Sequence, residues 1–341
     1  MIEIIIVCVV LLVVWVTWPK AGLAARWQQA RQLAARSRQE DALKHILKCE
    51  VNRQEPTLQS VAGALGISAN HAADLLSGLE SRELISYDKG RLHLEPRGRE
   101  LAVHVVRAHR LWESYLAERT GVAEADWHPQ AERQEHLLSP QQANALSAQL
   151  GHPLQDPHGD VIPIPGGELV SDPGQPLNTV APNVPVLITH IEDEPEAIYR
   201  RLSADGLRAG MKACVLEKTP QHLRFWADGR EYTLPPLMAN NIAVMPQPDW
   251  RSDDLFQEEF LPQLKSGEQA RVVALSSACR GPERRRLLDL GFVPGTTVKV
   301  EMTSPLRDPV AYRVRGSVIA LREEQARLIQ ITHREAVSPS A

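Results

Sequence analysis

The sequence predicts an α+β multidomain protein with an N-terminal transmembrane helix, a winged helix-turn-helix, a helical domain and two small β-barrels. Three observations lead to this expectation. The chain starts with an uninterrupted apolar run, its first half has helical periodicity, and its second half has short alternating strands between turn residues. A length of 341 residues fits about two to three domains, and 43% hydrophobic residues can supply their cores.

Residues 1–18 form the expected membrane anchor. From Ile4 to Val16 nothing is polar except Cys8, and at ~1.5 Å per residue the run reaches roughly 25 Å, slightly less than a bilayer core. Basic residues follow in the polar helix expected over residues 19–38, so the positive-inside rule predicts a single pass through the inner (cell) membrane. The amino terminus then lies outside and the remaining domains are cytoplasmic. The alternative is a buried core helix.

The composition excludes several classes of protein. The net charge is −4, so contact with nucleic acid has to come from a local basic patch. The four cysteines are scattered, which argues against a disulfide framework and against a zinc–cysteine site. The sequence has no convincing nucleophile–base arrangement, phosphate loop or dinucleotide-binding motif, so we do not expect an enzyme.

Residues 39–100 have the pattern of a winged helix-turn-helix. An apolar-periodic helix is followed by a second helix over residues 57–65, a tight glycine turn, and a third helix that Ser68 can cap. Two helices joined by a short turn of this kind are typical of the helix-turn-helix motif. Alternating residues around a turn over 84–94 then predict a two-stranded hairpin, the wing.

Residues 101–152 are expected to be helical. A long helix to about Arg119 precedes two shorter helices, near 128–136 and 140–150. Together they carry more apolar residues than a domain this small is expected to bury alone: Leu101, Val105, Leu111, Leu116, Leu137, Leu138 and Leu146. We therefore expect a homodimer.

Histidines and glutamates recur at helical spacing within this domain. Residues three or four apart on a helix share one face, which here would carry His128, Glu132, Glu135 and His136. The preceding helix adds His109 and Glu113, four residues apart. Imidazole and carboxylate ligands suit a divalent transition metal, so the two helices together predict a metal site. The alternative is a set of solvated side chains and i,i+4 ion pairs.

The second half of the chain is expected to hold the two β-barrels. Residues 153–187 are rich in proline and polar turn residues and predict an extended linker. Alternating strands follow over 188–248 and again over 261–333, where a short basic helix ends at Gly291. The acidic, proline-bearing stretch 249–260 predicts a second linker.

Residues 39–245 resemble the diphtheria-toxin-repressor family of metal-dependent transcriptional regulators. The points of resemblance are the winged helix-turn-helix, the segment Arg107–Glu113 and the segment His128–His136. The resemblance implies that residues 101–152 form a metal-binding and dimerisation domain.

Residues 261–332 are similar to a small accessory domain of ferrous-iron transport, called FeoA-like. The similarity rests on Arg285–Gly295 and on Ser304–Gly316. The two resemblances imply that both barrels are SH3-like.

The family resemblance implies two metal sites. The primary site corresponds to Asp41, Glu132, Glu135 and His136, with His109 contributing. The ancillary site corresponds to His109, Glu113, His128 and Glu194. Oxygen ligands favour Fe(II) or Mn(II) as the bound ion. Lys44 stands where the manganese-responsive branch has a second carboxylate, so we expect one ion in the primary site and not a close pair.

The resemblance also implies recognition of double-stranded DNA. The residues expected at the interface are Ser68, Asn70, His71, Arg82, Lys89 and Arg91. Asn70 and His71 can read base edges, whereas the basic side chains can hold phosphates. The presumed recognition helix also carries the acids Asp74 and Glu80, an unusual choice for a surface that faces phosphates. A helix-turn-helix kept only for structure or protein binding is therefore the alternative.

Two functions remain open at this point. The first is a membrane-anchored, Fe- or Mn-dependent transcriptional regulator of metal homeostasis. The second is a metal-sensing FeoA-like adaptor for a ferrous-iron transporter at the inner membrane, without DNA binding. Retention of DNA separates the two functions.

Overall fold

The computed structural model describes residues 23–88, 91–169, 174–252, 258–276, 279–306, 308–332 and 335–336. The expected anchor over residues 1–18 lies outside these residues. Among the helices described, none is long and apolar enough to cross a membrane. The chain divides into two compact units. The first unit runs to His109 and includes Glu132–Ala143 and Pro163–Ser171, and the second unit holds Arg110–Ala131, Asn144–Ile162 and the chain from Asp172 onward.

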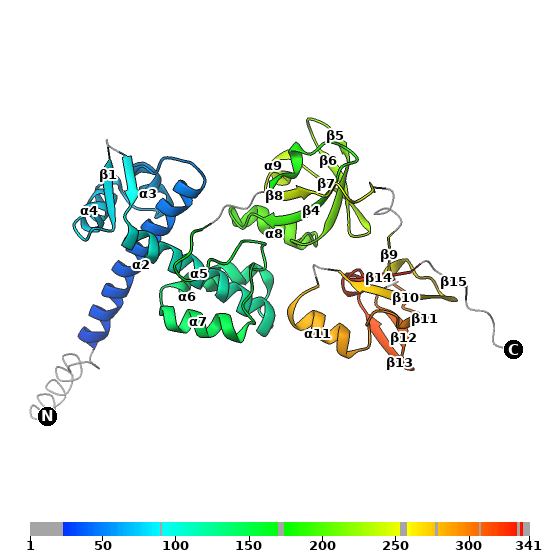
Figure 1. The fold of residues 1–341 in the computed structure, drawn as a ribbon. Coiled ribbons are helices and arrows are strands. Elements are labelled where there is room, and N and C mark those ends of the chain that lie inside the picture. Colours follow the sequence, from blue (N-terminus) through cyan, green and yellow to red (C-terminus); the bar gives the residue numbers. More distant parts are fainter. Residues whose placement is uncertain are drawn as a thin grey trace, which may run out of the picture. The chain divides into compact units, whose positions relative to one another are not determined.

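The first unit contains the winged helix-turn-helix that the sequence predicts (Figure 1). Its elements in chain order are α2 (Leu23–Val51), α3 (Leu58–Ala64), α4 (Ala69–Glu80), β1 (Ile85–Asp88) and β2 (Arg91–Leu94). The two strands pair antiparallel, with Ile85 opposite Leu94. The polar helix and the first helix of this domain, expected as separate elements, are the single helix α2. No proline or glycine interrupts this stretch, and alanine, glutamine and arginine favour helix.

Local capping fixes the two helices of the motif. Thr57 and Ser60 form a reciprocal capping box at the start of α3. The Ser68 hydroxyl accepts the backbone N–H of His71 at the start of α4. Behind them, apolar side chains of α2 and α4 share one buried cluster that includes Leu43, Ile46, Leu47, Leu76 and Leu79. A shift of α2 would therefore also shift the apolar core against which α4 packs.

The helical domain is built from α5 (Pro96–Arg119), α6 (Trp127–Glu135) and α7 (Pro140–Gln149), with the short 3-10 helix η1 (Glu124–Asp126) between the first two. Of the apolar residues expected at a dimer face, Val105, Leu111, Leu116 and Leu146 are buried within the single chain. Leu101 and Leu137 remain 38% and 56% exposed. Fewer apolar residues are therefore available for a dimer interface than the sequence predicts.

The stretch expected as a linker over 153–187 differs from that expectation at both ends. Gln155 and Val161 form a β-bridge around a tight turn. Farther on, Leu177 and Val180 are buried in the core of the following sheet. Proline does not prevent such packing where its missing N–H lies at a strand edge or in a turn.

The first of the two larger antiparallel sheets in the described residues has the strand order β3-β8-β4-β5-β6-β7. Its elements are β3 (Gln175–Pro176), η2 (Leu177–Thr179), β4 (Pro185–Ile191), α8 (Glu196–Ala204), β5 (Lys212–Lys218), β6 (Leu223–Ala227), β7 (Arg230–Leu234), α9 (Pro236–Ala239) and β8 (Ile242–Pro246). Inward residues such as Val186, Ile188 and Phe225 form its core. The alternation along these strands is what the sequence predicts.

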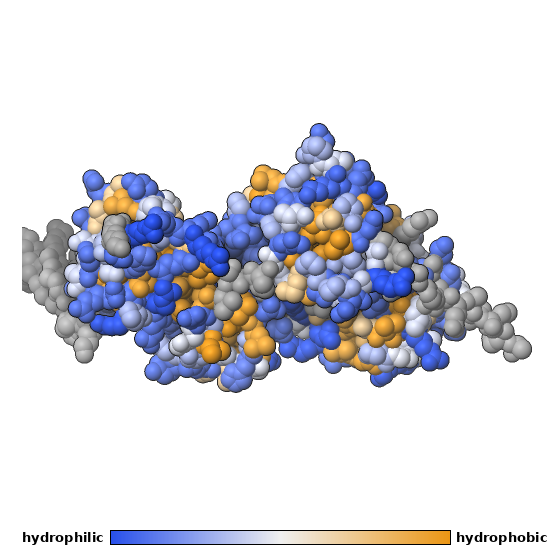
Figure 2. Space-filling view, turned by 45° about the horizontal axis from the view of Figure 1, so that its top comes forward, coloured by the Kyte–Doolittle hydropathy of each residue, from blue (hydrophilic) through white to orange (hydrophobic). Residues whose placement is uncertain are grey.

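The second sheet has the order β13-β12-β11-β10-β14-β9, and β15 pairs with β10. Its elements are β9 (Glu259–Phe260), η3 (Leu261–Gln263), β10 (Glu268–Leu275), α11 (Gly281–Asp289), β11 (Thr297–Thr303), β12 (Val310–Val314), β13 (Ser317–Leu321), α12 (Glu323–Ala326), β14 (Ile329–Ile331) and β15 (Glu335–Ala336). Tyr312 and Phe292 fill its core. The face in Figure 2 is mostly hydrophilic with smaller apolar patches, as expected of a folded chain in water.

Candidate metal centres and nucleic-acid interface

Three of the expected ligands come together in the first unit, in what we call the first cluster: Asp41, Glu135 and His136. Each offers one ligand atom, and these atoms lie within 4.8 Å of one another. Asp41 lies on α2, Glu135 is the last residue of α6, and His136 follows it. The cluster therefore links the helix that carries the winged domain to the helical domain.

Glu135 is buried and already has cationic partners. Its side chain is 1% exposed, and Lys44 Nζ donates to its two carboxylate oxygens at 3.0 and 2.9 Å. His109, which was expected to contribute to this site, lies 2.5 Å from Glu135 Oε2 through Nδ1. Burial alone would raise the pKa of Glu135, but the hydrogen bond from His109 and the charge of Lys44 lower it below its ordinary value. Glu135 is therefore a carboxylate at neutral pH.

His136 lies among three carboxylates. Its Nδ1 is 2.7 Å from Glu40, and its Nε2 is 3.1 Å from Asp41 and 3.5 Å from Glu135. Burial works against the charged imidazolium, yet hydrogen bonds to Asp41 and Glu40 raise the pKa of His136 to about 9. In the absence of metal, His136 is therefore a cation at neutral pH. The sequence did not single out Glu40, because it lies 96 residues from His136 and the family resemblance names only Asp41 in this part of the chain.

Glu132 is not part of the first cluster, although its spacing places it there. It is exposed on α6, whereas Glu135 on the same helix is buried. Because α6 ends at Glu135, His136 lies beyond the helix and the i,i+4 relation to Glu132 no longer holds.

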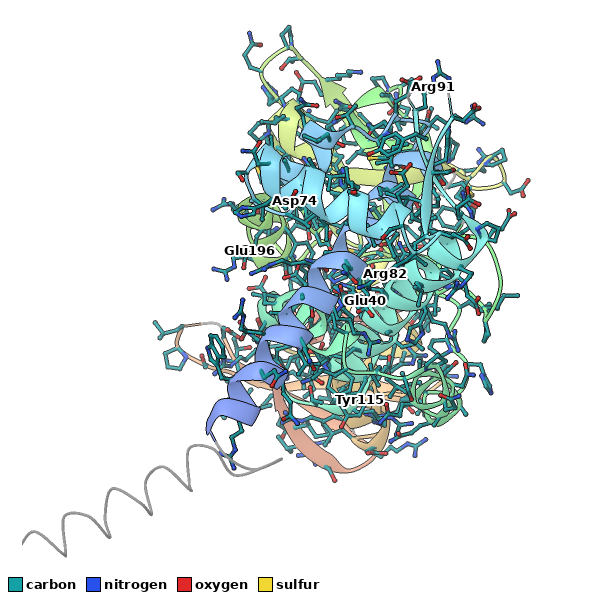
Figure 3. All side chains as sticks on the ribbon, turned by 90° about the vertical axis from the view of Figure 1, so that its left-hand side faces the viewer. Glu40, Asp74, Arg82, Arg91, Tyr115 and Glu196 are labelled. Carbon is teal, nitrogen blue, oxygen red and sulfur yellow. The ribbon has the colours of Figure 1, made fainter. Side chains whose placement is uncertain are left out.

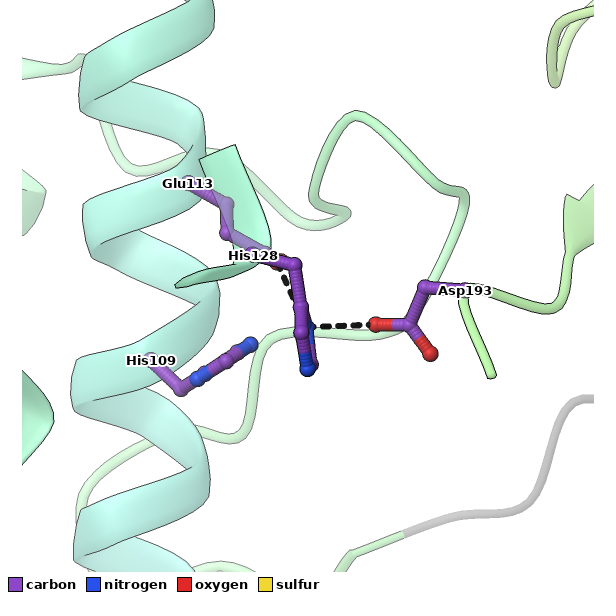
Figure 4. Close-up of side chains that lie close together, drawn as sticks. All are labelled: His109, Glu113, His128 and Asp193. Carbon is purple, nitrogen blue, oxygen red and sulfur yellow. Dashed lines mark ion pairs between the residues drawn. The ribbon is translucent and has the colours of Figure 1, made fainter. Parts of the chain in front are cut away.

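A second group of ligands gathers in the second unit, in what we call the second cluster: Glu113, His128 and Asp193. Glu113 lies on α5, His128 on α6 and Asp193 just after β4. His128 Nδ1 is 2.8 Å from Asp193 Oδ2 and 3.4 Å from Glu113 Oε1. Figure 4 shows these contacts, together with His109, which lies one turn before Glu113 on α5.

The second cluster uses Asp193 where the sequence singled out its neighbour Glu194. Glu194 is exposed, whereas the side chain of Asp193 is 18% exposed and turns toward His128. Successive side chains of extended backbone point to opposite sides, so an error of one residue reverses the direction. Burial raises the pKa of Asp193, but the hydrogen bond from His128 and its charge hold it well below the usual range.

His158 adds an imidazole that the sequence reasoning missed. It is 2% exposed, and its Nε2 lies 3.5 Å from Glu113 Oε1. Burial lowers its pKa, but the charge of Glu113 outweighs this and raises it to about 10. His158 thus neutralises Glu113 when no metal is bound.

The turn that positions His158 is ordered by its own residues. The Asp156 carboxylate accepts the backbone N–H groups of His158 and Asp160, each at 2.9 Å. Gly159 has φ +102°, and a Cβ there would lie 1.8 Å from the carbonyl oxygen of Thr189. The Asp-Pro-His-Gly-Asp run over 156–160 is a turn signature that could have indicated an ordered loop within the expected linker.

Both clusters have the chemistry of a site for a divalent transition metal, since each joins carboxylate oxygens to imidazole nitrogens. They differ in what the carboxylates already contact. In the first cluster, Lys44 holds both oxygens of Glu135, whereas in the second cluster Glu113 pairs with imidazoles that are themselves potential ligands. The donor set of the second cluster therefore fits a metal ion better.

The candidate nucleic-acid interface is the outer face of α4 with the wing. Asn70, His71 and Asp74 are exposed on α4, while Ala72, Leu76 and Leu79 of the same helix are buried. Ser68, also expected at this interface, caps the helix, and its hydroxyl lies 3.1 Å from His71 Nδ1. The helix thus presents polar side chains at its first turn, where its N–H groups favour phosphate.

The basic residues expected to hold phosphates flank this helix. Arg82 Nη1 donates to Gln39 at 2.9 Å, and Arg91 on the wing lies 3.1 Å from Glu55. The Arg91 and Glu55 side chains are each 65% exposed, so this ion pair is weak and can exchange for a phosphate. Figure 3 labels Asp74, Arg82 and Arg91 in this region. Lys89 lies outside the described residues.

Residues 95–164 match the family "Iron dependent repressor, metal binding and dimerisation domain", and residues 261–333 match the FeoA domain. An Fe(2+) transport protein A/Fe(2+) transporter FeoB fusion protein of Porphyromonas gingivalis is 41% identical over 81 residues, which are 24% of this chain. The matched part spans 9% of that curated relative.

Solved structures match 61% of the chain. A manganese-dependent transcriptional repressor in complex with manganese has a TM-score of 0.56 and 26% identity, covering 61% of this chain and 100% of the other. The repressor ScaR with bound Zn2+ gives 0.52 and 26%, and the manganese regulator SloR gives 0.51 and 25%. Each of these two covers 61% of this chain and 98% of its own. The chain therefore contains a metal-binding and dimerisation domain of the iron-dependent-repressor family and a FeoA domain, and 61% of it resembles a solved manganese-dependent repressor.

Proposed function

We propose that the protein regulates transcription of metal-homeostasis genes by binding double-stranded DNA as a homodimer in response to Fe(II) or Mn(II). The observation that carries the proposal is the convergence of ligands from distant segments. Asp41 meets Glu135 and His136 beneath the winged domain, and Glu113 meets His128 and Asp193. A metal site requires several ligands to lie close together, whereas charged residues exposed to water are not expected to gather in this way.

The first cluster is placed to transmit its state to the DNA-binding motif. Asp41 lies on α2, whose Leu43 and Leu47 pack in the same buried cluster as Leu76 and Leu79 of α4. Ion pairs join the two segments here, because Lys44 and Asp41 of α2 contact Glu135 and His136 at the end of α6. The contacts of Asp41 hold α2 in position, and the packing of α2 against α4 holds α4 in position.

Dimerisation is supported by the apolar residues that remain exposed. Leu137 is 56% and Leu101 is 38% exposed, and both belong to the first unit. A twofold dimer would place two recognition helices about one helical turn of DNA apart. Asn70 and His71 would read bases, and Arg82, Lys89 and Arg91 would hold phosphates.

The proposal is tested by DNA retention. Fluorescence anisotropy with a selected palindromic duplex should show binding in Mn(II) or Fe(II) and at least tenfold weaker binding in chelator, on the scale of a coupling free energy of about 1–3 kcal/mol. The matched variant is Asp193→Asn, which keeps the size of the side chain and removes one anionic ligand, so its DNA binding should lose the dependence on metal. Sequence-selective retention that is equal with and without metal would reject a metal-dependent regulator.

The alternative is an adaptor for a ferrous-iron transporter. It is favoured by the FeoA match and by the similarity of that segment to a transporter fusion protein. In this case the exposed acids Asp74 and Glu80 on α4 mark a surface that no longer meets phosphate. Absence of any sequence-selective DNA binding by metal-loaded dimer would favour the adaptor.

We further propose that residues 1–18 anchor the protein in the inner membrane, with the amino terminus outside. The support is the apolar run followed by basic residues in the sequence. Tethering would confine DNA binding to sites near the membrane.

A further inference from the structure

We infer that Lys44 is a resident cation that keeps metal out of the first cluster, so that the second cluster alone takes up the regulatory ion. The inference deepens the proposed function and rests on it. It assigns the response to Glu113, His128 and Asp193, and it makes the first cluster a permanent link between α2 and the end of α6.

The position of Lys44 carries the argument. Lys44 lies three residues after Asp41 on α2, on the side that meets Glu135. Its Nζ reaches both carboxylate oxygens, at 2.9 and 3.0 Å, so it spans the two lone-pair positions that a metal ion would use. The Glu135 side chain is 1% exposed, so little water competes for it. An ammonium has three donors and no acceptor, so it replaces a metal ion without becoming a ligand.

Fixed charges also balance the rest of the first cluster. Glu40, beside His136, is paired with Arg36 Nε at 2.6 Å, and Glu135 is paired with Lys44. A divalent ion entering here would have to displace a tethered ammonium and leave that charge near its own. Like charges at close range oppose binding strongly where water is scarce.

The second cluster has different partners. Glu113 pairs with His128 at 3.4 Å and with His158 at 3.5 Å, and Asp193 pairs with His128 at 2.8 Å. An imidazole is a common ligand for divalent transition metals, so the partners of these carboxylates can join the coordination of an ion. Metal uptake there requires no side chain to leave the site.

The test is the number of Mn(II) ions bound per full-length chain, measured by equilibrium dialysis of detergent-purified protein at neutral pH. We expect one ion for the natural protein, none for Asp193→Asn, and two for Lys44→Ala, with the affinity of the first cluster raised at least tenfold, on the scale of altering contacts around a metal site. Lys48→Ala is the matched control, because it removes an exposed lysine one turn later on α2 and should leave one ion.

A second readout does not depend on metal. In chelator, Lys44→Ala should lower the melting temperature because Glu135 loses its cation, and Mn(II) should restore it. Lys44→Gln, which keeps a hydrogen-bond donor without the charge, serves if Lys44→Ala does not fold, and it should also bind two ions.

Each result has one meaning. Two ions in the natural protein, or one ion in both Lys44 variants, would overturn the role of Lys44 and leave the proposed regulator intact. Loss of the single ion in Glu135→Gln with retention in Asp193→Asn would also overturn it. No ion bound by any of these proteins would reject the proposed metal-dependent function itself.

Discussion

The cationic state of His136 makes the stability of the metal-free protein depend on pH in a defined direction. Its pKa is raised from 6.5 to about 9 by Asp41 and Glu40, despite the opposing effect of burial. A raised pKa in the folded state contributes stability below the unfolded value of 6.5, and this stability is lost as pH rises through about 9. The window of change is therefore pH 6.5 to 9.

The magnitude follows from linkage. One pKa unit corresponds to about 1.4 kcal/mol, so the shift allows a contribution of about 3 kcal/mol at pH 6.5 that falls below about 0.5 kcal/mol at pH 9. The His136 side chain is 11% exposed, so solvent screening reduces this only modestly. We expect the free energy of unfolding to lose about 2–3 kcal/mol across the window through this residue alone.

The assay compares the protein with its His136→Gln variant in chelator. Urea unfolding, followed by circular dichroism, gives the free-energy difference between the two proteins at several pH values. Other titrating groups, including His158, contribute equally to both proteins and cancel. A difference that stays flat within about 0.5 kcal/mol, or that grows as pH rises, would refute the electrostatic account of the first cluster.

Four further predictions concern the rest of the chain. Arg91→Ala should weaken DNA binding to all sequences alike and reduce the dependence of log affinity on log salt concentration by about one. Asn70→Ala should instead relax the preference at one base pair by roughly 1–3 kcal/mol. Binding titrations at several salt concentrations in which the two variants behave alike would contradict this assignment. Gly159→Ala should destabilise the second unit by about 1–3 kcal/mol, because a Cβ would lie 1.8 Å from the Thr189 carbonyl oxygen at a φ of +102°. A variant that melts in calorimetry at the same temperature as the natural protein would contradict this. Leu137→Asp should weaken the homodimer, and sedimentation showing an unchanged dimer would exclude this face. The full chain should resist carbonate extraction from membranes, and deletion of residues 1–18 should release it; a full chain found in the soluble fraction would remove the anchor.

The sequence by itself determined the features that arise from local chemistry. Ser68 caps its helix through a side chain three residues from the group it binds, so its pattern can be recognised without the fold. Alternation and turn residues predict the wing and the two sheets in the same way. The ligand types in His109, Glu113 and His128 also indicated divalent metal, because coordination preference is a property of the side chain.

Only the tertiary structure decided which of these side chains meet. Asp193 enters the second cluster and Glu194 does not, because direction at the end of a strand depends on the register of the whole sheet. His158 reaches Glu113 from a proline-rich loop whose Gly159 lies close against the Thr189 backbone, a contact that the sequence does not show. Periodicity likewise cannot tell a dimer face from an internal one, so only the structure shows that Leu111 is buried within the single chain.

The role of Lys44 likewise depends on the tertiary structure and not on the local sequence. The family resemblance implies that a carboxylate ligand is replaced by Lys44, but the contact of Lys44 with both oxygens of Glu135 joins positions 91 residues apart. Local sequence fixes the charge and the reach of a side chain. Packing of α2 against the end of α6 fixes which carboxylate that charge meets, because the free energy of such a pair depends on burial that forms only with the fold.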